Sequence, residues 1–287
     1  MIAKPESRPQ ELSGQARHTL FVEGGKQGLD VLVLGELLPD LRVQPLGESR
    51  LVRAAAEVLR SVHPEYYFVI DRDSLDDERV EQTWRSFDQE GSSQLLIWRR
   101  RELENYFLAP EYLGQSSLVT CDSRDLEEVI LRAAQERVYV DAANLVLTAL
   151  RLALFTPHIG PLTLNDTTKT REGALQALLA IDGLAGFADS VRETLDTKAI
   201  AQKFQATVRR MMGDEERLRF GAGDWLKFTQ GKKVLNEVVT HCVTGGREQG
   251  HRRLQALARD LLRLPRNQQP DDFQLLHSLI TARIESR

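Results

Sequence analysis

The sequence of 287 residues has few of the features that mark a secreted, membrane-spanning or Cys-rich protein. It has two cysteines, Cys121 and Cys242, which lie far apart and show no metal-ligand spacing. A disulfide scaffold or a Cys-rich zinc site is therefore not expected, and a reducing cytoplasm fits better. The first 20 residues lack the apolar core of a signal peptide, and the longest apolar run, at 142–155, is too short to span a bilayer. We expect a cytoplasmic protein without membrane contact.

A surplus of basic residues is also lacking, because the formal net charge is −4. This balance argues against a strongly basic nucleic-acid coat, although it leaves room for a local basic groove. The glycine-rich turn Gly24-Gly25-Lys26-Gln27-Gly28 lacks the spacing of an ATPase phosphate loop, so we do not expect ATP binding. The six histidines form no regularly spaced ligand cluster. The hydrophobic share of 41% and the charged share of 28% are those of an ordinary globular protein.

The first third of the chain alternates between strand and helix patterns. Strands are predicted at residues 18–22, 41–46, 66–70 and 94–98, and helices at 30–38, 48–60 and 76–89. Pro45 marks the end of the second strand or an edge position. This alternation predicts an α/β fold with a mostly parallel, Rossmann-like four-stranded sheet.

The pattern becomes helical after about residue 110. Helices are predicted at 125–155, 171–195, 199–212, 232–243, 247–264 and 271–284. We therefore expect an α/β domain over residues 1–114 and an all-α domain over residues 115–287, which either packs on the sheet or forms its own bundle.

Acidic residues follow three of the four predicted strands. Glu23 follows the first, Asp71 and Asp73 follow the third, and Glu102 and Glu104 come shortly after the fourth. The carboxyl ends of parallel strands meet at one edge of a sheet, which is where ligands bind in such folds. A single carboxylate at a strand end is as readily a solvated group or a helix cap. Five together would repel one another unless cations neutralised them.

Hard divalent cations with oxygen ligands, chiefly Mg²⁺ or Mn²⁺, suit this set of carboxylates. Asp71 and Asp73 flank Arg72, so in an extended segment both acids face the same way, and Glu102 and Glu104 repeat this arrangement around Leu103. Two such pairs with Glu23 would hold two ions. Paired ions are suited to the hydrolysis of a phosphodiester.

The segments Phe21-Val22-Glu23-Gly24, Asp71-Arg72-Asp73 and Arg100-Arg101-Glu102-Leu103-Glu104-Asn105-Tyr106-Phe107-Leu108 resemble the motifs of Toprim nucleases of the overcoming-lysogenisation-defect type. The resemblance covers residues 20–113 and fades afterwards. The short layout is similar to the Toprim effector subunits of PARIS antiphage systems. This resemblance implies a Toprim fold, and it implies metal-ligating or water-activating roles for Glu23, Asp71, Asp73, Glu102 and Glu104.

Two further residues depend on the resemblance. The family has an acid four residues after the first glutamate, where this chain has Gln27, so Asp30 takes that place if the turn is lengthened. The alternative is that Asp30 caps its helix. The family also uses a late lysine to stabilise charge on the phosphate, and Gly231-Lys232 resembles that element. The alternative for Lys232 is a surface lysine in the first turn of a helix.

The resemblance implies a Mg²⁺-dependent endoribonuclease that cleaves transfer RNA. It implies further that an ABC-type ATPase partner holds the protein inactive, and that the released protein dimerises. Arg100 and Arg101 would contact the nucleic-acid backbone, neutralise the nearby acids, or do both. Two rival functions share the same carboxylates: a DNA-nicking or DNA-cleaving enzyme of the same fold, and a non-catalytic subunit with a structural ion.

Overall fold

A four-stranded parallel sheet forms the centre of the first part of the chain. The computed structural model describes residues 18–73, 75–88, 93–154, 189–244 and 250–286, together with residue 176. The strands are β1 (Thr19–Glu23), β2 (Arg42–Gly47), β3 (Tyr66–Ile70) and β4 (Leu95–Ile97). They are hydrogen-bonded in the order β2-β1-β3-β4, and every pair is parallel. The predicted parallel α/β sheet is therefore confirmed.

The sequence of each strand agrees with its place in the sheet. Strand β3 is a central strand, and its run of aromatic and β-branched residues is almost wholly buried. Strand β2 lies at an edge and accommodates Pro45, which cannot donate a ladder hydrogen bond. The register between β1 and β2 shifts after Val22, so that Glu23 lies opposite Gly47. This irregularity lies at the carboxyl end of β1, where a bulge changes the direction of the side chain.

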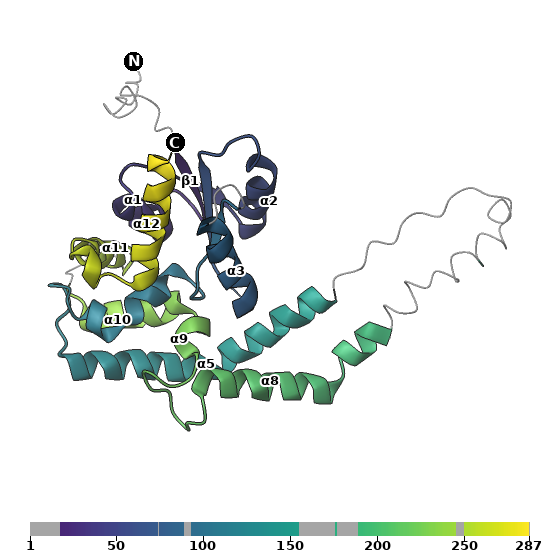
Figure 1. Ribbon diagram of the computed structural model, residues 1–287. Coiled ribbons are helices and arrows are strands. Elements are labelled where there is room, and N and C mark those ends of the chain that lie inside the picture. Colours follow the sequence, from purple (N-terminus) through teal and green to yellow (C-terminus); the bar gives the residue numbers. More distant parts are fainter. Residues whose placement is uncertain are drawn as a thin grey trace, which may run out of the picture. The chain divides into compact units, whose positions relative to one another are not determined.

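The connecting helices cover both faces of the sheet. They are α1 (Leu29–Leu37), α2 (Ser49–Leu59) and α3 (Asp77–Asp88). Strands β2 and β3 lie on opposite sides of β1, so right-handed crossovers place α1 on one face and α2 and α3 on the other. Figure 1 shows this arrangement, with α1 separated from α2 and α3 by the sheet.

Helices dominate after β4. The elements are η2 (Leu103–Leu108), α4 (Pro110–Leu113), α5 (Ser123–Ala153), α8 (Thr197–Met212), α9 (Trp225–Phe228), α10 (Gly231–Cys242), α11 (Gly250–Leu262), η3 (Arg266–Gln268) and α12 (Asp271–Glu285). Five of the predicted helices have counterparts here. The helix predicted at 171–195 lies mostly outside the described residues. Within the described segments, no helix is long and apolar enough to cross a bilayer.

The chain divides into two compact units that do not follow the predicted boundary at residue 114. One unit comprises residues 1–136 and 225–287, and the other comprises residues 137–224. Helices α9 to α12 therefore belong with the sheet and do not form a separate bundle with the rest of the helical half. The reason is burial: Val234, Leu235 and Val238 of α10 are fully buried, and α10 packs against η2 while α11 packs against α1.

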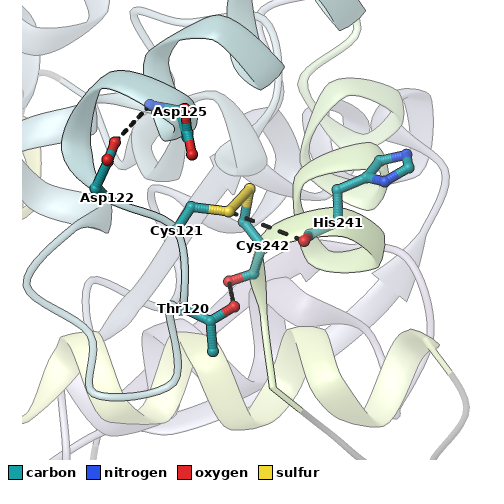
Figure 2. The surroundings of a disulfide bond; sticks show 6 residues. All are labelled: Thr120, Cys121, Asp122, Asp125, His241 and Cys242. Atoms are coloured by element: carbon teal, nitrogen blue, oxygen red, sulfur yellow. Dashed lines mark hydrogen bonds between the residues drawn. A yellow bond between two sulfur atoms is a disulfide. The ribbon is translucent and has the colours of Figure 1, made fainter.

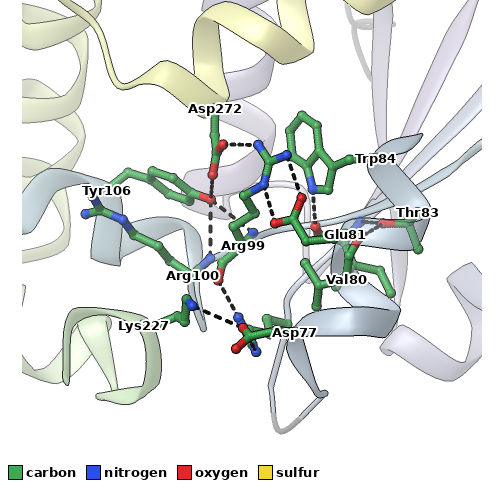
Figure 3. A network of polar contacts seen from close by, with 12 residues as sticks. Asp77, Val80, Glu81, Thr83, Trp84, Arg99, Arg100, Tyr106, Lys227 and Asp272 are labelled. Carbon is green, nitrogen blue, oxygen red and sulfur yellow. Dashed lines mark hydrogen bonds and ion pairs between the residues drawn. The ribbon is translucent and has the colours of Figure 1, made fainter. Parts of the chain in front are cut away.

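A network around Arg99 joins β4, α3 and α12 (Figure 3). The Arg99 guanidinium donates to both carboxylate oxygens of Glu81, at 2.7 and 2.9 Å, and to Asp272 Oδ1 at 2.6 Å. It also stacks over the ring of Trp84, 4.4 Å from its centre. The Tyr106 hydroxyl donates to the other oxygen of Asp272. These charge-assisted bonds attach the C-terminal helix to the end of the sheet.

The two cysteines form a disulfide, contrary to the expectation from the sequence (Figure 2). Cys121 and Cys242 are 121 residues apart in sequence, but short backbone pairings bring their segments together. Thr120 N–H donates to the Cys242 carbonyl at 2.8 Å, and Thr244 N–H donates to the Leu118 carbonyl at 2.8 Å. Sequence spacing alone could not show this pairing. Disulfides are typical of oxidising compartments, so the cytoplasmic location stays a prediction that this bond does not favour.

Candidate metal centre

The candidate site lies where the strand order reverses. Glu23 ends β1, and Asp71 directly follows β3, the neighbouring strand. The helices that follow these two strands leave on opposite faces, which opens a crevice at the carboxyl edge of the sheet. The Asp71 N–H donates to Glu23 Oε1 at 3.0 Å, so the two acids are fixed side by side. Burial raises the pKa of Glu23 to about 7, and the negative charges of Asp73 and Asp30 contribute.

Asp30 is directed into the same site from the first turn of α1. The N-cap of this helix is Gly28, which makes no side-chain cap, so Asp30 is not the capping residue. Burial raises the pKa of Asp30 to about 6. The positive charge of Lys232 opposes this rise, and the negative charge of Glu102 adds to it. Asp30 therefore shares an electrostatic environment with residues from two distant segments.

The segment around Asp71 and Asp73 is not extended, contrary to the prediction. Asp73 has a φ of +52°, in the left-handed region, so the two side chains do not follow the alternation of a strand. Burial raises the pKa of Asp71 well above its usual range, and the charges of Asp30 and Glu23 add to the rise. Its Oδ1 atom is buried and has no hydrogen-bond partner among the described residues. A buried carboxylate oxygen without a partner is costly unless a proton or a cation is nearby.

Asp73 is exposed and lies at the margin of the site. Partial desolvation of its carboxyl still raises its pKa, while the positive charges of Arg101 and Arg53 lower it. The positive charge of Arg53, on α2, also interacts with the carboxylate of Glu23. Arg53 could not be singled out from the sequence, because an arginine in an amphipathic helix is usually an ordinary surface residue.

Glu102 and Glu104 also depart from the predicted extended pair. Glu102 is the N-cap of η2, and Glu104 is buried within this short 3₁₀ helix. The helical turn replaces the alternation expected around Leu103, so the two carboxylates do not face one way as they would in a strand. Burial raises the pKa of Glu104 to about 7, and the charges of Asp30 and Glu102 contribute to the rise.

Lys232 reaches the site from the opposite end of the sequence. Its backbone N–H donates to Glu102 Oε2 at 2.9 Å, and its positive charge lowers the pKa values of Asp30 and Glu104. It is an exposed residue in the first turn of α10, as the alternative assignment had it, but it also faces the carboxylates.

Asn105 and Gly231 position Lys232, and neither positioning role was predicted from the sequence. Asn105 is fully buried, and its amide donates to the carbonyls of Leu226 and Thr229 at 2.9 and 3.0 Å. Gly231 packs directly on Asn105, because a Cβ atom on Gly231 would lie 2.7 Å from the Asn105 backbone nitrogen. The small residue thus lets α10 approach η2. No local sequence signal reveals this contact, which joins residues 126 positions apart.

Arg100 and Arg101 make intramolecular contacts. Arg100 donates to the Asn105 carbonyl at 2.7 Å and stacks over Tyr106, and Arg101 donates to the Phe228 carbonyl at 2.9 Å. Arg101 also stabilises the charged form of Asp73. Arg101 therefore neutralises a neighbouring acid, which is one of the two roles expected for this pair. The other role, contact with nucleic acid, stays a prediction.

The chemistry of this set suits a hard divalent cation. The donors are carboxylate oxygens, one of them buried without a partner among the described residues, and burial together with mutual repulsion raises several of their pKa values. In the described part of the chain, however, no three His, Cys, Asp or Glu side chains are grouped closely enough to hold an ion as they are placed.

The raised pKa values predict how stability depends on pH. Glu23 and Glu104 have pKa values of about 7 in the folded chain, against an ordinary value of 4.5, so the folded state holds more protons between these pH values. Stability must therefore fall as the pH rises through this window. We expect a higher melting temperature at pH 5 than at pH 8 in EDTA. Mg²⁺ should raise the melting temperature more at pH 8 than at pH 5.

Differential scanning fluorimetry measures both effects. Glu36→Gln, which neutralises an exposed carboxyl on α1, serves as a control and should keep the pH dependence of the wild type. Glu23→Gln should weaken it. A melting temperature that rises from pH 5 to pH 8 in EDTA would contradict the burial of these carboxylates.

Comparisons of the sequence with protein-family models and with curated proteins found no match.

Proposed function

We propose that this chain is a divalent-metal-dependent phosphodiesterase of the Toprim nuclease type, acting on nucleic acid. One observation carries the proposal: β1, α1, the end of β3, η2 and α10 bring carboxylates and one lysine together at the switch point of a parallel sheet. A structural core has no need of so many partly buried acids with raised pKa values. A site for cations and a phosphate does need them.

The residues divide by position within the site. Glu23, Asp30 and Asp71 are proposed as the principal cation ligands, with Glu102 and Glu104 as further ligands and Asp73 at the margin. Bound Mg²⁺ or Mn²⁺, proposed as two ions, would supply Lewis acidity and lower the pKa of a coordinated water. Glu104, with a pKa of about 7, is suited to hold or accept a proton near neutral pH. Lys232 provides the positive charge that would stabilise the developing negative charge on the phosphate.

The substrate that we propose is RNA, and transfer RNA in particular. The resemblance to the PARIS effectors supports this choice, and it also motivates our proposal of an ABC-type ATPase partner and of dimerisation in the active form. The sheet edge itself would serve RNA and DNA equally well, because the metal and the lysine act on the phosphodiester group.

The test is cleavage by the purified chain of transfer RNA and of supercoiled DNA, each with Mg²⁺ or with EDTA. We expect transfer RNA to be cut with Mg²⁺ only. Nicking of DNA would support the DNA-cleaving rival. A chain that binds Mg²⁺ in a calorimetric titration but cleaves neither substrate would support the non-catalytic rival.

Lys232→Ala should lower the cleavage rate by about 10²-fold, because it removes a positive charge directed at the phosphate. The backbone N–H bond to Glu102 remains, so folding should be unaffected. Lys233→Ala is a matched control, since Lys233 is an exposed lysine in the same helical turn. Equal cleavage rates for Lys232→Ala and Lys233→Ala would show that Lys232 has no particular role in the site. The measurement is the single-turnover rate at saturating Mg²⁺.

A further inference from the structure

An open groove beside the candidate metal centre has a cationic rim. It has a volume of about 690 Å³ and lies between α1, α11 and the turn that joins β1 to α1. Its floor is formed by Val31, Leu32 and Gly35 of α1. Lys26, Arg252 and Arg259 line its rim. A half-buried apolar floor with positive charges above it suits a ligand that has both anionic groups and flat or apolar parts.

The charge of the rim is only partly neutralised. Arg259 forms a long ion pair with Glu36, with 3.8 Å between Nε and Oε1. Lys26 and Arg252 are exposed, and neither forms an ion pair with another residue in the described segments. Within those segments, two positive charges thus remain for a ligand. They form a local positive region in a chain whose formal net charge is −4.

The groove is held in shape by contacts between its walls. The Gln27 carbonyl accepts a hydrogen bond from the Gln255 side chain at 3.2 Å, and His251 Nε2 lies 3.1 Å from the same oxygen. The turn is therefore fastened to α11, with Lys26 beside the α11 side chains. A ligand would bind without having to order the turn first, which lowers the entropic cost of binding.

The same turn connects the groove to the metal centre. Glu23 stands directly before the turn, and Asp30 stands two residues after Gly28, which lines the groove. A strand with one phosphate at the carboxylates would pass over this turn into the groove. The carboxylates repel a polyanion, so nearby positive charge is needed to attract the substrate.

We propose that this groove binds the sugar-phosphate backbone of the substrate strand beside the scissile bond. Lys26 and Arg252 bind phosphate groups, and the apolar floor receives the face of a sugar or base. This inference rests on the proposed function, since it names the path of the substrate through that same site.

Binding of a fluorescent single-stranded oligoribonucleotide tests the proposal, with Ca²⁺ in place of Mg²⁺ to slow cleavage. The double variant Lys26→Met/Arg252→Met should raise Kd about tenfold. It should also reduce the slope of log Kd against log salt by about 1.4, because two phosphate contacts are lost at about 0.7 each. Arg85→Met/Arg124→Met removes two exposed arginines outside the groove and should leave both values unchanged.

Cleavage kinetics with Mg²⁺ separate this inference from the proposed function. The groove variant should raise KM more than it lowers kcat, because it loses binding to both the ground state and the transition state. Unchanged Kd, salt slope and KM in the groove variant would show that the groove does not bind the substrate. If Asp71→Asn still abolished cleavage, the proposed function would stand without the groove. If the wild type bound no oligonucleotide, the groove would be overturned as well, and Mg²⁺-dependent cleavage would decide the proposed function separately.

Discussion

Asp71→Asn should lower the rate of phosphodiester cleavage by about 10²- to 10³-fold, the effect of removing several kcal/mol of metal-dependent stabilisation. Asp71 is the central acid of the candidate site, because its N–H donates to Glu23 and its carboxyl interacts electrostatically with Glu23 and three other carboxylates. The amide keeps the size of the side chain but cannot carry the charge that a divalent cation needs. Single-turnover cleavage of labelled transfer RNA at saturating Mg²⁺ measures the loss.

The same substitution should stabilise the metal-free chain. Burial and neighbouring charge raise the pKa of Asp71, so its ionised form is disfavoured in the folded state at neutral pH. An amide removes that repulsion, and the melting temperature in EDTA at pH 8 should rise. The increase that Mg²⁺ causes in the wild type should shrink. A variant that loses activity while gaining stability has lost a functional group and has kept its fold.

Asp76→Asn is the matched control for charge removal nearby. Asp76 is exposed and accepts the N–H of Arg79 at 2.8 Å, which caps the start of α3. Asparagine preserves that cap, so neither stability nor cleavage should change much. If Asp76→Asn and Asp71→Asn reduced cleavage equally, the loss would reflect general electrostatics of this face and Asp71 would have no special role.

The strands and their acidic ends were predictable from sequence because each depends on local pattern. The run Tyr66 to Ile70 is aromatic and β-branched, and Asp71 follows it directly. The strand order was not predictable, because it depends on pairings between distant segments. In the observed order β2-β1-β3-β4, the pairing of β1 with β3 makes Glu23 and Asp71 neighbours at the switch point. The sequence pattern therefore identifies the acidic residues, and the strand order determines which of them lie side by side.

Backbone detail within the motifs was also beyond the sequence. The alternation of Glu102 and Glu104 is compatible with a strand, but the structure has a 3₁₀ helix there. Asn105 explains the difference: its side chain accepts the N–H of Glu102 at 3.1 Å, and its amide bonds two carbonyls near α10. These contacts with a segment more than 120 residues away decide the local conformation. The pairing of Cys121 with Cys242 depended on the same kind of long-range contact.

Gly231→Ala should destabilise the chain by about 3 kcal/mol, because it overpacks a buried contact between backbones. The added methyl group would lie 2.7 Å from the Asn105 backbone nitrogen and would overlap its side-chain oxygen as well. Asn105 cannot easily yield, because it is fully buried and its amide makes two hydrogen bonds. We expect the melting temperature to fall by about 6–12 °C, measured by scanning calorimetry.

Gly35→Ala, in the same compact unit, should have the opposite effect on stability. Gly35 lies inside α1, and a Cβ atom there would have no neighbour within 4 Å. Alanine is more favourable than glycine in a helix interior by about 1 kcal/mol, so this variant should be slightly more stable than the wild type. Equal melting temperatures for both glycine variants would contradict the close approach of α10 to η2.

The effect of Gly231→Ala on the site follows from the direction in which the strain is relieved. Since Asn105 is fixed, α10 must move away from η2, and the Lys232 N–H then leaves Glu102, which it contacts at 2.9 Å in the wild type. Cleavage should therefore fall even at temperatures where the variant is fully folded. Asn105→Ala in the same chain removes the side-chain part of the clash, so the double variant should lose less stability than the sum of the single losses. Strict additivity would mean that Gly231 and Asn105 do not act on each other, and that the lysine is placed by some other contact of α10.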